Sequence, residues 1–300
     1  MKVIITDPIA PAGVEILKAA GLEVDERPGL PPEELLAAIP AYDAIIVRSA
    51  TKVTRPVIEA GTNLKCIGRA GVGLDNVDRE AAKEKGIKVV NTPAATSISV
   101  AELALGWMFC AARDLVNATV SMRAGKWEKK KFKGTELFGK TLGIIGSGRI
   151  GTELAKRAEA LGMKVLVLDP YIKECLYGTV CRLDELLPQA DYISLHLPRT
   201  EETAGMLGAA QFARMKDGVV FVNCARGGIV DEDALYEACK TGKVAMACVD
   251  VYGKEPLEDF KLFSLPNVYG SPHIGAQAKE GQLRAGIGIA ENVRDALLGR

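Results

Sequence analysis

Short runs of β-branched and other apolar residues alternate with helix-like segments along most of this chain, and this alternation constrains its fold more than any other feature. It is typical of parallel α/β structure, because parallel neighbours need a crossover segment, usually a helix, between them. The first hundred residues contain five such runs, from KVIITD to KVVNT. A second series begins with TLGIIG at Thr141 and ends with NVYGSPH. We therefore predict an α/β protein with two parallel sheets.

Two long helix-like segments lie outside these series. The apolar positions of residues 97–122 fit one long amphipathic helix that bridges the two units. After Ala276, the segment KEGQLRAGIGIAENVRDALL is predicted to form a helix long enough to return to the first unit. The predicted domains are therefore residues 1–96 with 277–300, and residues 97–276.

The composition argues against several kinds of partner. Of the 300 residues 48% are apolar, and 38 basic residues balance 38 acidic ones without a long run of like charge. We therefore expect a small-molecule partner rather than nucleic acid or an anionic membrane. No apolar stretch is long enough for a signal peptide or a membrane span, which predicts a cytoplasmic protein. The seven cysteines are scattered without a CxxC pair, which favours buried reduced thiols over disulfides or a metal site.

The segment GSGRIG, residues 146–151, predicts a dinucleotide site. A bare GxGxxG pattern is weak, but this one follows an apolar strand and enters a helix pattern. Gly146 would permit a tight turn, Gly148 a close approach of the backbone to a pyrophosphate, and Gly151 close packing of helix on strand. Asp169, eighteen residues after Gly151, is near the spacing expected of a carboxylate that binds an adenosine ribose. An acid there favours NAD over NADP, although an ordinary glycine-rich turn is the structural alternative.

Polar side chains follow the later strands of the second series. They are His196 with Pro198, Arg226, Asp250 with Glu255, and His273. Because ligands of open parallel sheets bind beyond the carboxyl ends of the strands, we expect these residues at one site. The residue types suit hydride transfer, since an imidazole exchanges the alcohol proton, a guanidinium binds a carboxylate and an acid tunes the imidazole.

Each of these residues also has an ordinary explanation. His273 could be a hydrogen-bonded loop residue, Glu255 a solvated turn acid and Arg226 a structural ion-pair partner. Their joint occurrence at consecutive strand ends favours the functional interpretation.

The segments LGIIGSGRIG, VNCARGGIVDEDAL, DVYGKEP and SPHIGA carry a resemblance that covers essentially the whole chain. In order and spacing they are similar to signatures of the D-isomer-specific 2-hydroxyacid dehydrogenase family. The resemblance implies two doubly wound parallel-sheet domains, a flavodoxin-like substrate domain and a Rossmann NAD-binding domain, with an active-site cleft between them. It also implies that Arg226 holds the substrate carboxylate and keto oxygen. Glu255 would orient His273 and stabilise its protonated form, and His273 would donate and accept the proton.

The same resemblance assigns residues to the cofactor NAD. Arg149, Ile150 and Asp169 would hold the pyrophosphate and ribose, and Asp250 would face the nicotinamide side. The residues implied for NAD are Val72, Gly146, Gly148, Arg149, Ile150, Gly151, Asp169, His196, Pro198, Thr203, Cys224, Ala225, Asp250 and Gly275.

The segments RSATKVT, GRAGVGLDNVD, NTPAATSISVAE and GKWEKKKFKGTEL look like the D-3-phosphoglycerate dehydrogenase branch of the family. That branch oxidises 3-phosphoglycerate to 3-phosphohydroxypyruvate, the first step of phosphorylated L-serine biosynthesis. Three cations of the first unit would supply charge for the phosphate, although they could equally line a solvated face. Backbone N–H groups at Val72 and Gly73 would receive a carboxylate. The predicted substrate-binding residues are Arg48, Ser49, Lys52, Arg69, Val72 and Gly73.

Several features depart from the family pattern or leave alternatives open. Arg199 stands in HLPRT where leucine is usual, and the short connection from Asp169 to Leu183 predicts a reduced helix. The chain stops at Arg300 without the regulatory extension of many phosphoglycerate dehydrogenases, so serine feedback through such a domain is not expected. A glyoxylate or hydroxypyruvate reductase would keep the same catalytic residues, and a corepressor-like protein would sense NAD without turnover. By resemblance we expect a homodimer built through residues 97–122 and no metal.

Overall fold

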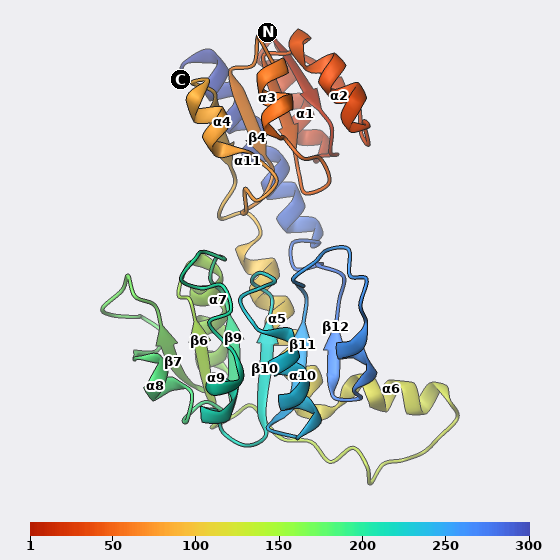
Figure 1. Ribbon diagram of the computed structural model, residues 1–300, viewed down its shortest axis with the longest axis vertical. Helices are drawn as coiled ribbons and strands as arrows, with labels where there is room; N and C mark the ends of the chain where they lie inside the picture. The colour runs from red at the N-terminus through yellow and green to blue at the C-terminus, as the bar shows by residue number, and fades with distance from the viewer. The chain divides into compact units, whose positions relative to one another are not determined.

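The computed structural model describes all 300 residues, which divide into two compact units. One unit comprises Met1–Ser97 with Ala276–Arg300, and the other comprises Ile98–Gly275. Each unit is a parallel sheet with helices on both faces (Figure 1), which confirms the predicted fold class. None of the helices combines the length and the apolar character needed to cross a bilayer.

The first unit contains a five-stranded sheet in the order β2-β1-β3-β4-β5, which is the flavodoxin-like order. Its strands are β1 (Lys2–Ile5), β2 (Glu23–Glu26), β3 (Ala44–Val47), β4 (Cys66–Arg69) and β5 (Lys88–Asn91). Its helices are α1 (Pro11–Ala19), α2 (Pro32–Ala38), the 3-10 turn η1 (Ile39–Ala41), α3 (Arg55–Ala60), α4 (Arg79–Glu84) and α11 (Lys279–Leu298).

Alternating side chains of the strands build two apolar layers in this unit. Ile4 and Ile45 pack on one face, against α2, α3 and α4, while Ile5 and Ile46 pack on the other, against α1 and α11. A Cβ on Gly13 in α1 would overlap the backbone of Gly286 in α11, so glycine is needed for these helices to approach so closely. The C-terminal helix therefore completes the core of the first unit.

The second unit contains a seven-stranded parallel sheet in the order β12-β11-β10-β9-β6-β7-β8, which is a Rossmann order with one added strand. Its strands are β6 (Thr141–Ile145), β7 (Lys164–Leu168), β8 (Thr179–Val180), β9 (Tyr192–Leu195), β10 (Val219–Asn223), β11 (Val244–Val249) and β12 (Val268–Gly270). Its helices are α5 (Ser97–Arg113), α6 (Leu115–Arg123), α7 (Arg149–Ala160), α8 (Leu183–Leu186), α9 (Ala209–Arg214), α10 (Glu232–Lys240) and the 3-10 turn η2 (Lys261–Ser264). Helices α5 and α7 cover one face, and α8, α9 and α10 cover the other.

Two details differ from the sequence-based expectation. The segment predicted as one helix is two, because Asp114 adopts the left-handed conformation with φ 49°. Its carboxylate accepts hydrogen bonds from the Asn117 amide, at 2.9 Å, and from the Tyr269 hydroxyl, so tertiary partners stabilise the break. Strand β8 was not predicted, since it has only two residues. A reduced helix was predicted after β7, and the structure has no helix between β7 and β8.

The seven cysteines are all free thiols. Four of them are buried, as predicted, but Cys110, Cys175 and Cys181 are only half-buried. The interpretation of these thiols as reduced core residues therefore holds for four positions.

Candidate active site

The loop between β6 and α7 is shaped by its glycines. Gly146 has φ 97°, and a Cβ on it would lie 2.5 Å from the carbonyl oxygen of His196. A Cβ on Gly151 would overlap the carbonyl oxygen of Gly146. A Cβ on Gly148 would meet no heavy atom within 4 Å and would extend into open space. Gly146 and Gly151 are therefore needed for close packing of the backbone, while Gly148 leaves the surface of the loop open for a ligand to approach.

Helix α7 begins at Arg149, directly after Gly148. Gly148 is its N-cap residue and offers no side chain to its first amides. The N–H groups of Arg149, Ile150 and Gly151 therefore precede the first amide that finds a helical partner, which is that of Thr152. A helix N-terminus of this kind suits a phosphate, so the loop fits the pyrophosphate of a dinucleotide.

Asp169 follows β7 and binds the backbone of the glycine loop. One carboxylate oxygen accepts from the N–H of Ser147 at 2.8 Å, and the other accepts from the N–H of Tyr171 at 3.0 Å. Each oxygen retains acceptor capacity, so binding of a ribose hydroxyl stays a prediction that the geometry allows.

The residues after β9 form a turn that is stabilised by its own hydrogen bonds. His196 is 9% exposed, and its Nε2 lies 2.9 Å from the Ser194 hydroxyl. Burial lowers the pKa of His196 to about 3, so the ring is neutral at physiological pH. The Thr203 hydroxyl donates to the carbonyl oxygen of Pro198 at 2.7 Å and accepts from the N–H of Thr200 at 2.7 Å. The side chains predicted to contact NAD here therefore also shape the loop.

Arg226 lies in a restrained loop after β10. Its guanidinium donates to the Ala225 carbonyl oxygen at 2.7 Å, and its own carbonyl oxygen accepts from Asn223 at 3.3 Å. Cys224 and Ala225 are buried. A Cβ on Gly227 would overlap the backbone of Tyr252, so this loop is packed directly against the one that follows β11.

Asp250 directly follows β11 and anchors the loop after β12. Its carboxylate is 1% exposed and accepts from the Ser271 hydroxyl at 2.6 Å and from the N–H groups of Ile274 and Gly275, both at 2.8 Å. Between these anchors, His273 adopts φ 53°, a conformation that non-glycine residues rarely adopt. Asp250 therefore stabilises the unusual backbone that presents His273.

The His273 ring is oriented by Glu255. Its Nδ1 lies 2.6 Å from Glu255 Oε2, and the two side chains are 46% and 35% exposed. The Tyr252 N–H donates to the other oxygen of Glu255 at 3.0 Å, and its hydroxyl donates to the carbonyl oxygen of Ser271 at 2.9 Å. Burial raises the pKa of Tyr252 to about 12, so this hydroxyl stays a donor. The arrangement engages Nδ1 of His273 and leaves Nε2 as the ring nitrogen outside this pair.

The predicted substrate-binding residues belong to the first unit. Arg48, Ser49 and Lys52 lie on the loop after β3. Arg69 is the last residue of β4, the neighbouring strand, and Val72 and Gly73 follow that strand. Gly71 has φ 144°, and the Arg69 guanidinium packs where its Cβ would be. The Asn91 amide donates to the carbonyl oxygen of Val72 at 2.6 Å. These residues therefore share one edge of the five-stranded sheet.

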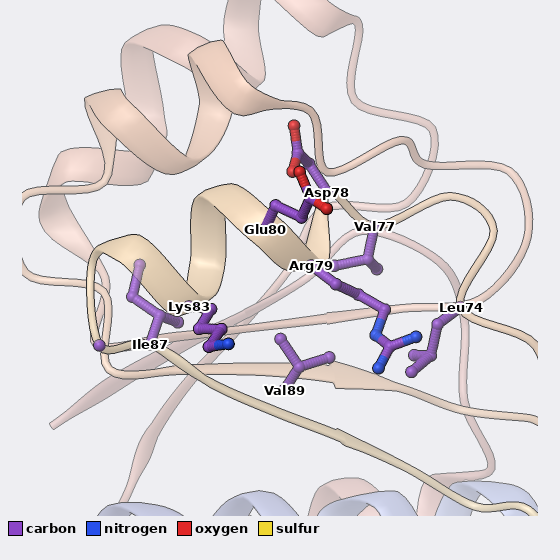
Figure 2. A pocket seen from close by; sticks show the side chains of 9 residues that line it. Leu74, Val77, Asp78, Arg79, Glu80, Lys83, Ile87 and Val89 are labelled. Carbon is purple, nitrogen blue, oxygen red and sulfur yellow. The ribbon is translucent and has the colours of Figure 1, made fainter.

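Two depressions of the surface lie elsewhere. One, of about 790 Å³, is lined by α4 and β5 with the loops beside them (Figure 2). Arg79 and Lys83 project beside Val89 and Ile87, while Asp78 and Glu80 point the other way, so its charge is mixed. Another, of about 730 Å³, is lined by the segment around Phe132 and Gly134. Neither depression is lined by the polar residues at the strand ends, and we assign no ligand to either.

Sequence reasoning missed Asp7 and Asn76, which support the loop of Arg48 in the first unit. The available signal for Asp7 was its position two residues after a buried strand, close to the strand end as Asp169 and Asp250 are.

The parallel sheet, the glycine loop and the N-terminus of α7 define a dinucleotide-binding protein with an open parallel sheet. Residues 105–275 match the family model of the D-isomer specific 2-hydroxyacid dehydrogenase NAD binding domain, and the chain belongs to this family. The match confirms the predicted cofactor, NAD.

Individual relatives agree with this assignment. The chain is 51% identical to the D-3-phosphoglycerate dehydrogenase of Methanocaldococcus jannaschii, over 100% of this chain and 58% of that protein. It is also 51% identical to the hydroxypyruvate reductase of Thermotoga maritima, over 97% of each chain. Among solved structures it is similar to the NAD⁺-bound 3-phosphoglycerate dehydrogenase of Entamoeba histolytica, with a TM-score of 0.84 and 33% identity over 99% of this chain and 95% of that one.

The chain spans 54% to 58% of the length of several phosphoglycerate dehydrogenase relatives. Their identity to this chain, 45% to 51%, confirms the predicted resemblance to that branch.

Proposed function

We propose that this protein is an NAD-dependent D-3-phosphoglycerate dehydrogenase that interconverts 3-phosphoglycerate and 3-phosphohydroxypyruvate, in the first step of phosphorylated L-serine biosynthesis. The observation that carries the proposal is the His273–Glu255 pair at 2.6 Å, on the same edge of the NAD-binding sheet as Arg226. A histidine held by a carboxylate through Nδ1 can exchange a proton through Nε2.

The roles of the protein groups follow from this geometry. In the reducing direction protonated His273 donates its Nε2 proton to the carbonyl oxygen, and in the oxidising direction neutral His273 takes the hydroxyl proton. Glu255 fixes the ring and stabilises the imidazolium that forms during oxidation. Arg226 binds the substrate carboxylate and carbonyl oxygen, which orients the reacting carbon. NAD, when bound, supplies the hydride acceptor, and the open surface before Gly148 with the first amides of α7 is proposed to hold its pyrophosphate.

The phosphate is proposed to bind the cations of the first unit. Arg48 is half-buried and Lys52 is exposed, on a loop whose backbone is firmly held. Arg69 is the last residue of the neighbouring strand, β4, and N–H groups near Val72 and Gly73 are proposed to receive a carboxylate.

A hydroxypyruvate reductase is the second candidate, because the Thermotoga maritima relative of that name matches over 97% of both chains. The deciding experiment follows NADH oxidation with 3-phosphohydroxypyruvate, hydroxypyruvate, glyoxylate and pyruvate and compares kcat/KM. Preference for the phosphorylated acid supports the dehydrogenase, whereas preference for hydroxypyruvate or glyoxylate supports the reductase. Arg48→Ala serves as the check, since a phosphate contact predicts a rise in KM for the phosphorylated acid alone. Failure to turn over any of the four acids would favour an NAD-sensing binding protein.

We propose a homodimer formed through α5, α6 and the segment that follows them. Figure 1 shows α6 projecting from the body of the second unit. This region exposes many large apolar side chains, which are Ile98, Phe109, Leu115, Val116, Val120, Met122, Trp127 and Phe138. So many exposed apolar side chains along one part of the chain support an interaction surface. Sedimentation should show a dimer for the native chain and a monomer for Val120→Glu. A cytoplasmic location is also proposed, supported by seven unpaired thiols.

A further inference from the structure

The carboxylate of Asp7 is buried beneath the loop that follows β3. Asp7 comes two residues after β1 and is 4% exposed. Its Oδ2 accepts from the backbone N–H groups of Arg48 at 2.6 Å, Ala50 at 3.2 Å and Thr51 at 3.1 Å. Its Oδ1 accepts from the Thr51 hydroxyl at 2.7 Å. One carboxylate therefore satisfies four donors of a single short loop.

Asn76 holds the same loop through its carbonyl groups. Its side-chain amide donates to the carbonyl oxygen of Arg48 at 2.8 Å and to that of Thr51 at 2.6 Å. The donors of the loop therefore turn toward Asp7 and two of its acceptors turn toward Asn76. A loop bound in this way keeps its backbone conformation without a ligand.

The side chains that this loop presents are those proposed to meet the substrate. Ser49 and Lys52 are exposed and Arg48 is half-buried. Converging N–H groups of this kind can bind an anion, and here the carboxylate of Asp7 takes that place. The backbone N–H groups of the loop therefore bind Asp7, while the side chains of Arg48 and Lys52 can bind an external anion. Preorganisation of this kind lowers the entropic cost of ordering the loop upon binding.

We propose that Asp7 is a positioning residue that presets the loop of residues 48–52 for the anionic end of the substrate. The inference rests on the proposed function, because it takes that loop to be the anion-binding one. It assigns Asp7 no contact with the substrate. Its effect is exerted on KM through Arg48 and Lys52 rather than on the chemical step.

Two substitutions at Asp7 separate positioning from simple charge. Asp7→Asn can keep an oxygen toward the three N–H groups and donate its amide to the Thr51 hydroxyl, so it retains the bonds but loses the charge. Asp7→Ala loses both. We expect Asp7→Ala to raise KM for 3-phosphohydroxypyruvate about 10-fold or more, with kcat and NADH affinity within about 3-fold of wild type. Asp7→Asn should stay near the wild-type KM. A purely electrostatic effect predicts the opposite sign, because removal of a negative charge near cations favours anion binding.

Asp43→Ala is the matched control. Asp43 lies just before β3, at the other end of the same strand, and its carboxylate accepts from the N–H of Lys2 at 2.7 Å and from the Lys65 ammonium at 2.8 Å. Its loss should lower stability without a change in KM. An Asp7→Ala enzyme whose KM matches that of Asp43→Ala would overturn the proposal. If Asp7→Ala does not fold, Asn76→Ala provides the same comparison, and an unchanged KM there counts against the positioning role.

Hydrogen exchange distinguishes failure of this inference from failure of the proposed function. The amides of residues 48–51 should exchange faster in Asp7→Ala than in Asp7→Asn or wild type. Unchanged exchange would overturn the inference even in an active enzyme. A wild-type protein that turns over none of the 2-oxo acids would instead overturn the proposed function, while faster exchange in Asp7→Ala would still support the hold of Asp7 on its loop.

Discussion

The glycine loop of the second unit allows a test in which protein stability and cofactor binding respond differently. Gly148 and Gly151 lie three residues apart, but an added methyl group would meet different surroundings. At Gly148 it would meet nothing within 4 Å, and the backbone there, with φ −67° and ψ −165°, is extended. At Gly151 it would overlap the carbonyl oxygen of Gly146. The two alanine variants therefore perturb the same loop by different mechanisms.

The expected magnitudes follow from these surroundings. For Gly151→Ala the loop or helix must move by about 1 Å, and overpacking of this kind costs about 1–3 kcal/mol of unfolding free energy. For Gly148→Ala the reduced entropy of the unfolded chain contributes about 0.4–1 kcal/mol. The preference of helix N-caps for glycine over alanine offsets this by a similar amount, so we expect a net change within about 0.5 kcal/mol. Both variants should bind NADH about 100-fold more weakly. The methyl group of Gly148→Ala would occupy the space proposed for the pyrophosphate, whereas Gly151→Ala would shift the loop that binds it by about 1 Å.

Urea unfolding and NADH fluorescence titration measure the two quantities separately. Gly106→Ala, in helix α5, is the control, because its added methyl also meets nothing within 4 Å but lies away from the loop. It should bind NADH normally. Wild-type NADH affinity in Gly148→Ala would refute the placement of the pyrophosphate over this glycine. Wild-type stability in Gly151→Ala would refute the packing argument.

Further predictions concern the strand ends of the second unit. His273→Ala should lower kcat about 100-fold or more while NADH affinity is retained, as measured by steady-state kinetics and titration. Asp250→Ala should lower the free energy of unfolding by about 3 kcal/mol, because three internal donors lose their acceptor, and urea unfolding tests this. Burial lowers the pKa of His196 from 6.5 to about 3, so between these values only the unfolded chain takes up the proton, and stability falls as the pH falls through this window. His196→Asn should abolish that contribution, about 2 kcal/mol between pH 7.5 and pH 5, in urea unfolding at both pH values.

The sequence was sufficient to predict the two sheets and the positions of most strand-end residues. Apolar runs and glycine patterns depend on local chemistry, so the two parallel sheets and the turn at Gly146 could be predicted. The break at Asp114 could not, because its left-handed conformation is stabilised by Tyr269, which is distant in sequence. The same holds for the roles of Asp7 and Asp250, whose hydrogen-bond partners are brought close only by strand pairing.

Three carboxylates that follow strands share one structural role. Asp7 after β1 holds the loop after β3, Asp169 after β7 holds the loop after β6, and Asp250 after β11 holds the loop after β12. In each case the two strands are neighbours in the sheet. Loops at the carboxyl ends of parallel strands carry N–H groups that have left the ladder, and a carboxylate on the adjacent strand end is the nearest acceptor that can satisfy them.

This shared role changes how Asp250 is expected to act. A carboxylate offers about four lone-pair sites, of which Asp169 uses two while it is half-buried, so a ribose can still reach it. Asp250 uses three while it is 1% exposed, which leaves little access for a ligand. We therefore expect Asp250 to influence turnover through the backbone of His273. Asp250→Asn should lower kcat with NADH affinity unchanged, whereas direct contact with the nicotinamide predicts that NADH affinity falls as well.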